Sequence, residues 1–83
     1  MKSLAIFASG SGTNAENIIR YFSNSEFFKV AIVLSNKQGA GVHERAKKLN
    51  VPSISFSREA FESGEAILDI LKTYQIDFIV LAG

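Results

Sequence analysis

The sequence predicts an α/β fold in which one parallel sheet carries helices on both faces. Short apolar runs alternate with stretches of helical periodicity, in the order β-α-β-α-β-α-β. The first apolar run leads directly into a loop with two glycines, and the last run is followed by another glycine. With 83 residues, 47% hydrophobic and 20% charged, the chain has the composition of one small globular domain.

The first strand and the first helix are predicted within residues 4–25. Residues 4–8 are uninterruptedly apolar, which is typical of a central parallel strand covered on both faces. A helix is expected to begin at Thr13, because Thr13 and Glu16 have the spacing of a capping box. Residues 23–25 close this helix. Its apolar stripe, which should pack against the sheet, consists of Ala15, Ile18, Ile19 and Phe22.

A second strand and a second helix follow the same pattern. The strand covers residues 28–34, and a polar turn at residues 35–39 separates it from a helix at about residues 42–49. Asn50 is a suitable left-handed cap for that helix. The residues expected to face inward are Val42, Ala46 and Leu49.

The second half of the chain supplies an edge strand, a third helix and the last strand. Residues 51–56 alternate in polarity and carry a proline near their start, as expected of an edge strand. Residues 57–64 are interpreted as a polar connection with one or two short turns. Asp77 introduces the last strand, residues 78–82. The third helix, which precedes it, has an apolar stripe of Ala66 or Ile67, Leu71 and Tyr74.

Right-handed crossovers between these strands predict the strand order 3-2-1-4. The direction of winding reverses between the first and the fourth strand. Open α/β sheets bind ligands at such a reversal, outside the carboxyl ends of the strands. Residues 10–14 and residues 81–83 both reach this crevice.

The loop at residues 10–14, Gly-Ser-Gly-Thr-Asn, is predicted to hold a phosphate. The first amides of a helix have no partner within the helix, and the helix dipole adds partial positive charge at that end. Glycine permits a sharp turn and lets an anion approach the backbone closely. Thr13 and Asn14 add a hydroxyl donor and an amide donor.

Two other interpretations of this loop stay open. It can be a tight, well-capped turn without a ligand. It also reads G-x-G-x-x-A with Ala15 in the third place, the fingerprint of a Rossmann-like dinucleotide-binding fold. The NAD form needs an acid at the end of the second strand, where residues 35–37 are Ser-Asn-Lys. Lys37 suits a 2′-phosphate instead, so the alternative is an NADP-binding module of an oxidoreductase.

The remaining polar residues predict no active site. His43 is the single histidine and is expected to be an exposed helix residue beside Glu44 and Arg45. The absence of cysteine excludes disulfides and thiolate metal sites, and favours the cytosol. A net charge of +1 provides no broad field for nucleic acid or an anionic membrane. No metal, nucleic acid or membrane partner is expected.

Three segments together resemble the phosphoribosylglycinamide formyltransferases: residues 8–14 (Ala-Ser-Gly-Ser-Gly-Thr-Asn), 33–37 (Val-Leu-Ser-Asn-Lys) and 79–83 (Ile-Val-Leu-Ala-Gly). The resemblance covers the whole chain in order. It implies a partial formyltransferase fold, with residues 1–83 as the N-terminal, phosphate-binding half of the domain. In that family the loop amides hold the 5′-phosphate of the substrate. The resemblance therefore assigns substrate binding to Gly12, Thr13 and Asn14.

The implied reaction is formyl transfer from 10-formyltetrahydrofolate to the amine of glycinamide ribonucleotide, in de novo purine biosynthesis. The family's catalytic asparagine, histidine and aspartate fall beyond Gly83, so we expect an active longer enzyme and an inactive 83-residue chain.

Gly64 stands where members often carry an arginine near the folate's glutamate tail, which leaves that contact open. The last strand lacks a neighbour on one edge, so self-association through this edge, or through the uncovered helix faces, is expected. An inactive folded fragment that binds nothing tightly is a further hypothesis.

Overall fold

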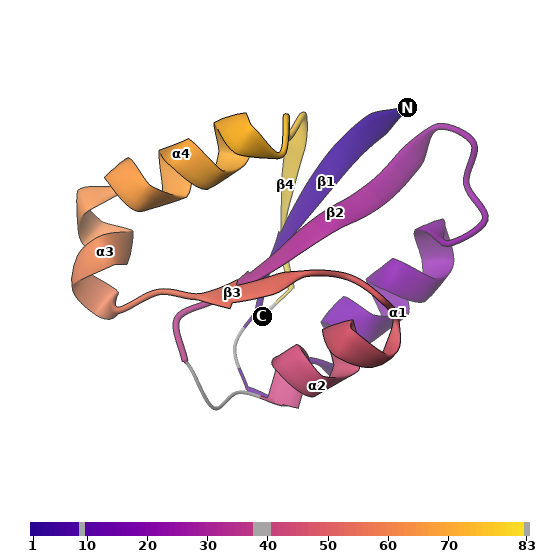
Figure 1. The fold of residues 1–83 in the computed structure, drawn as a ribbon. Helices are drawn as coiled ribbons and strands as arrows, with labels where there is room; N and C mark the ends of the chain where they lie inside the picture. Colours follow the sequence, from indigo (N-terminus) through magenta and orange to yellow (C-terminus); the bar gives the residue numbers. More distant parts are fainter. Residues whose placement is uncertain (9, 38–40, 83) are drawn as a thin grey trace.

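Four parallel strands form the sheet in a computed structural model of the chain, which describes residues 1–8, 10–37 and 41–82 apart from the side chain of residue 58. The strand order is β3-β2-β1-β4, with β1 and β2 in the centre (Figure 1). The predicted order 3-2-1-4 and the predicted parallel sheet are therefore confirmed.

The two central strands are the long ones. β1 spans Lys2–Phe7 and β2 spans Phe28–Ser35, whereas the edge strands β3 and β4 span only Ser53–Ser55 and Phe78–Leu81. The predicted edge strand at 51–56 is thus observed at half its expected length. Val51 does not join the sheet, because its amide donates to the Ala46 carbonyl at 2.9 Å, whereas Pro52 and Phe56 flank β3 and still form hydrogen bonds with Val33 and Ser35 of β2.

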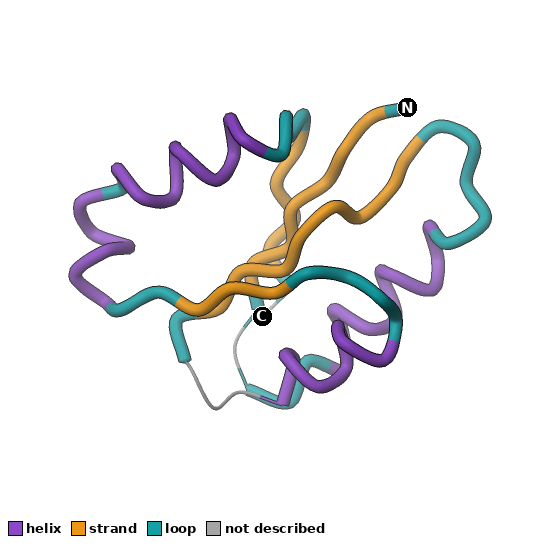
Figure 2. The backbone as a smooth tube through the Cα atoms, in the orientation of Figure 1, coloured by secondary structure: helices purple, strands orange, loops and turns teal. Residues whose placement is uncertain are grey.

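Helices cover both faces of the sheet, as predicted. Helices α1 (Thr13–Phe22) and α2 (Gly41–Lys48) lie on one face, and α3 (Arg58–Ser63) and α4 (Glu65–Thr73) lie on the other (Figure 2). The predicted left-handed residue after α2 is confirmed, since Asn50 has φ 61°. None of the helices in the described parts of the chain has the length and apolarity needed to cross a membrane.

The core has two layers because successive residues of a strand point to opposite faces. Ile6 and Val33 face α1 and α2, where the buried cluster also contains Ala8, Ala15, Ile19, Val42, Ala46 and Ala82. On the other face Ala5, Ile32 and Leu34 form a cluster with Ile67 of α4. Aromatic side chains widen this second layer, with the Phe7 and Phe61 rings 5.2 Å apart.

The predicted capping box at the start of α1 is wrong. Gly12 occupies the N-cap position with a left-handed backbone, φ 80° and ψ 16°, and no side chain caps the helix there. Thr13 is already helical, and its Oγ1 lies 3.2 Å from Ser11 Oγ. A capping box needs its hydroxyl residue in the extended conformation before the first turn. Glycine takes that place in this chain, so Glu16 is left to bind other partners.

The segment 57–64 was expected to be a polar connection, and it contains helix α3 instead. Ser57 is extended and accepts a hydrogen bond from the Ala60 amide at 3.1 Å, which is an ordinary N-cap. Gly64 has φ 75° and ends this helix before α4 begins at Glu65. Both signals are local in the sequence. The helix has only six residues, too few for an apolar period to reveal it.

Candidate phosphate site at the start of helix α1

The glycine loop lies at the carboxyl ends of three neighbouring strands. It connects β1 to α1, and the Ala8 amide before it donates to the Leu34 carbonyl of β2 at 2.9 Å. On the other side of β1, the Ala82 amide after β4 donates to the Phe7 carbonyl at 2.8 Å. The loop therefore stands beside the point where the strand order reverses, which is where open α/β sheets bind ligands.

Helix α1 begins with backbone amides that have no hydrogen-bond acceptor among the described residues. Its first backbone hydrogen bond runs from the Glu16 amide to the Gly12 carbonyl, at 2.9 Å. Within the described ranges 1–8, 10–37 and 41–82, the amides of Gly12, Thr13 and Asn14 have no hydrogen-bond acceptor. Thr13 and Asn14 are exposed, and Gly12 is buried. The arrangement has the geometry and the dipole of an anion site.

Helix α2 packs directly on the backbone of this loop. A Cβ on Gly12 would lie 2.5 Å from Val42 Cα and 2.6 Å from Val42 Cβ. A Cβ on Gly41 would lie 3.1 Å from the Ser11 carbonyl oxygen. The Val42 amide is also 3.4 Å from the Gly10 carbonyl oxygen, to which it donates. The loop is therefore held between two helices, and its shape depends on glycine at both contact points.

Arg45 of α2 reaches the same loop, a contact that the sequence analysis missed. Its Nε donates to the Ser11 carbonyl at 2.7 Å, and its Nη1 donates to Glu16 Oε1 at 2.9 Å. Arg20, one turn after Glu16, donates from Nε to Oε2 at 3.2 Å. No spacing in the sequence reveals the Arg45 contact, because 34 residues separate Arg45 from Ser11.

These two arginines hold the Glu16 carboxylate in its charged form. The hydrogen bond from Arg45, followed by that from Arg20, lowers the pKa of the Glu16 carboxyl below its ordinary value, against a smaller opposing effect of desolvation. A lowered pKa in the folded state stabilises the protein above the pKa of the unfolded chain. That stabilisation is lost as the pH falls through the folded-state pKa.

We expect the substitution Glu16→Gln to reduce the free energy of unfolding near neutral pH and to have a progressively smaller effect in acid. Urea titrations of both proteins between about pH 7 and about pH 3 measure this difference. Glu26→Gln is the matched control, since Glu26 is an exposed carboxylate with no ion pair among the described residues. A difference between wild type and Glu16→Gln that stayed constant over this range would contradict the expectation.

His43 is not the exposed residue that the sequence analysis predicted. It is half-buried, with Nδ1 2.8 Å from Ser53 Oγ and Nε2 3.1 Å from the Lys37 carbonyl oxygen. A carbonyl oxygen only accepts hydrogen bonds, so Nε2 carries the hydrogen and donates a hydrogen bond to the Lys37 carbonyl. The imidazole thus links α2 to β3 through Ser53 and to Lys37, two residues after the end of β2. This role is structural.

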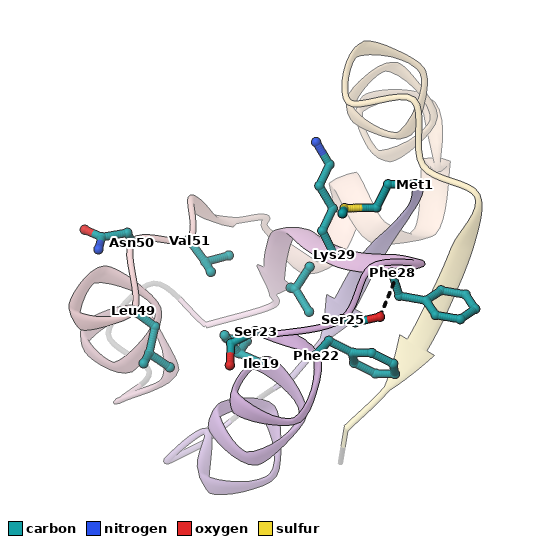
Figure 3. A pocket seen from close by; sticks show the side chains of 11 residues that line it. Met1, Ile19, Phe22, Ser23, Ser25, Phe28, Lys29, Leu49, Asn50 and Val51 are labelled. Carbon is teal, nitrogen blue, oxygen red and sulfur yellow. Dashed lines mark hydrogen bonds between the residues drawn. The ribbon is translucent and has the colours of Figure 1, made fainter.

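A hollow of about 310 Å³ lies at the end of the sheet opposite to the glycine loop (Figure 3). It opens near the start of β2 and the end of α1, and apolar side chains such as Ile19, Phe22 and Val51 line it. The polar ends of Lys29 and Asn50 point away from it in Figure 3. Small-molecule sites need a few polar groups that converge on the ligand. The glycine loop is therefore the better candidate.

Comparisons with known proteins show the family and agree with the fold. The formyl transferase family model matches residues 2–83. The phosphoribosylglycinamide formyltransferase of Haemophilus influenzae is 40% identical over 88 residues, and the alignment covers all of this chain and 42% of that protein. The Bacillus subtilis protein of the same name is 33% identical, with 100% and 45% covered. The chain thus spans less than half the length of these curated relatives.

Solved structures give the same result. A phosphoribosylglycinamide formyltransferase from Bacillus halodurans superposes with a TM-score of 0.83 and 44% identity, over 99% of this chain and 45% of that one. A glycinamide ribonucleotide transformylase from Geobacillus kaustophilus gives 0.84 and 44%, over 98% and 46%. The similarity extends over the glycine loop and all four strands.

Proposed function

We propose that this chain, which belongs to the formyl transferase family, is the phosphate-binding part of a phosphoribosylglycinamide formyltransferase. Residues 1–83 would form the N-terminal half of the formyltransferase domain. The proposal rests on the amides of Gly12, Thr13 and Asn14, which lie at the reversal of the strand order and have no acceptor in the part of the chain that the structure describes. The side chains of Thr13 and Asn14 are exposed and add donors at the same place. The proposed ligand is the 5′-phosphate of glycinamide ribonucleotide.

In the proposed reaction the chain anchors and orients the nucleophile. Formyl transfer joins the glycinamide nitrogen to the formyl carbon, breaks the bond between that carbon and the donor nitrogen, and moves one proton from the glycinamide amine to the donor nitrogen. The formyl group comes from a folate-type donor, proposed to be 10-formyltetrahydrofolate. Phosphate held at the start of α1 restricts the position of the distant amine, which lowers the entropic cost of attack. We assign no catalytic residue to this chain, because Glu16, the carboxylate nearest the loop among the described residues, is bound by Arg45 and Arg20.

Gly64 offers no side chain for a contact to the folate. Gly64 stands where formyltransferases of the resembled family often carry an arginine. It ends α3 with φ 75°, and a Cβ placed there would meet nothing within 4 Å. The backbone at this position is therefore open, but glycine offers no charge to a glutamate tail. We propose no folate contact through Gly64, and no metal in the site. We also propose that the protein acts in the cytosol, in de novo purine biosynthesis.

Titration of the ¹⁵N-labelled chain tests the proposed function. Glycinamide ribonucleotide, inorganic phosphate and NADPH are added separately, and amide resonances are followed. We expect the ribonucleotide to shift the amides of Gly12, Thr13 and Asn14 most strongly, and phosphate to shift the same amides at higher concentration. A response to NADPH alone would favour the dinucleotide-binding alternative. No response to any of the three would identify an inactive folded fragment.

Self-association through β4 is also part of the proposal. This strand pairs only with β1 among the described strands, and its Phe78, Ile79 and Leu81 side chains are exposed. An unpaired apolar edge offers hydrogen-bonding groups to a second chain. Light scattering at increasing protein concentration measures the mass, and a monomer at every concentration would contradict this part.

A further inference from the structure

We infer that Arg45 is a positioning residue of the phosphate site, acting on both the backbone and the charge of the loop without being part of α1. The inference rests on the proposed function, since it concerns the same loop. It is carried by two contacts from one guanidinium: Nε to the Ser11 carbonyl at 2.7 Å and Nη1 to the Glu16 carboxylate at 2.9 Å. Each contact removes an obstacle to anion binding.

The first contact sets the direction of a peptide group. The peptide bond between Ser11 and Gly12 is planar and trans, so the Ser11 carbonyl and the Gly12 N–H point in opposite directions. Arg45 holds the carbonyl oxygen on the side of α2. The Gly12 N–H is therefore directed to the other side of the loop. Glycines on both sides of Ser11 have left-handed backbones, a conformation in which glycine alone is unstrained, so this loop has few backbone restraints of its own.

The second contact concerns the charge next to the site. Glu16 lies in the first turn of α1, where a carboxylate stabilises the helix but repels a second anion. The side chain of Glu16 is 23% exposed, and one of its oxygens is bound by Arg45. Arg45 brings a guanidinium to the carboxylate and to the loop at once. An approaching phosphate therefore meets a neutralised pair and not an isolated carboxylate.

Arg20 provides a matched control within the chain. It binds the other oxygen of the same carboxylate and carries the same charge, but it makes no hydrogen bond to the loop among the residues that the structure describes. If Arg45 acted only through its charge, loss of either arginine would weaken anion binding to a similar degree. If Arg45 also orients the Ser11–Gly12 peptide, its loss must have a larger effect.

The experiment compares Arg45→Met, Arg45→Lys and Arg20→Met in the full chain, with inorganic phosphate and glycinamide ribonucleotide as probes. We expect Arg45→Met to weaken ribonucleotide binding about tenfold or more, as loss of a charged hydrogen-bond donor does, and Arg20→Met to weaken it less than about threefold. Arg45→Lys keeps the charge but not the fork of donors, so an intermediate loss is expected. Without any ligand, the Gly12 amide resonance should move in both Arg45 variants and stay in Arg20→Met.

Each outcome decides for or against the inference. Equal losses in Arg45→Met and Arg20→Met, or an unchanged Gly12 resonance in Arg45→Met, would overturn it. If the wild-type chain bound neither probe, the proposed function would fail, and the ligand-free Gly12 resonance would still show whether Arg45 orients the loop. Should Arg45→Met fail to fold by circular dichroism, Arg45→Lys serves as the deciding variant.

Discussion

Replacing Gly12 by alanine is expected to lower the free energy of unfolding by about 2–5 kcal/mol and to abolish the proposed phosphate binding. Two costs add. An L-residue in the left-handed region costs about 1–2 kcal/mol, and Gly12 has φ 80°. Overpacking costs about 1–3 kcal/mol more, because the new Cβ would lie 2.5–2.7 Å from the Cα, Cβ and Cγ2 atoms of Val42. Helix α2 must then move away from the loop, which changes the backbone at the start of α1.

Gly10→Ala is the control for this prediction. Gly10 also has a left-handed backbone, with φ 74°, but a Cβ there would meet nothing within 4 Å. We therefore expect a loss of about 1–2 kcal/mol, from the backbone alone. Urea unfolding measures stability, and titration with glycinamide ribonucleotide measures binding. Equal losses at Gly10 and Gly12 would show that the contact with α2 has no energetic weight.

Replacing Ile6 by alanine is expected to destabilise the chain by about 2–5 kcal/mol, the usual range for deleting a buried branched side chain. Ile6 lies on the central strand β1, is fully buried, and packs in the cluster shared by α1 and α2. The neighbouring strands place Val33 and Val80 beside it, so the cavity has walls on both sides that cannot easily collapse. For a domain of marginal stability, about 5–15 kcal/mol, this is a large share.

Ile79→Ala is the matched control, because Ile79 has the same side chain on the edge strand β4 and is 47% exposed. Ile79→Ala should lower the free energy of unfolding by about 1 kcal/mol or less, because the Ile79 side chain buries a smaller apolar area than that of Ile6. Circular dichroism during urea titration measures both variants. Losses of similar size would mean that the sheet has no preferentially buried centre.

The order of elements was predictable because it depends on patterns within short windows. Uninterrupted apolar runs mark β1 and β2 as central strands, and the helical stripe places Ala15 and Ile19 against the sheet. Helix α3 was missed since its signals are a cap and a terminal glycine and not a period. The capping box was misread because Thr13 and Glu16 have the right spacing while Gly12 adopts the capping position.

The sequence by itself determined the parallel sheet, its strand order and the place of a glycine loop before the first helix, because hydrophobic period and crossover handedness are properties of local chain segments. The tertiary structure alone decided what surrounds that loop. Val42 against Gly12, Arg45 on the Ser11 carbonyl and His43 between Ser53 and Lys37 all join residues that are brought together only when α2 folds onto the sheet. No period or spacing encodes these contacts, because their geometry depends on how two helices pack on one face of the sheet.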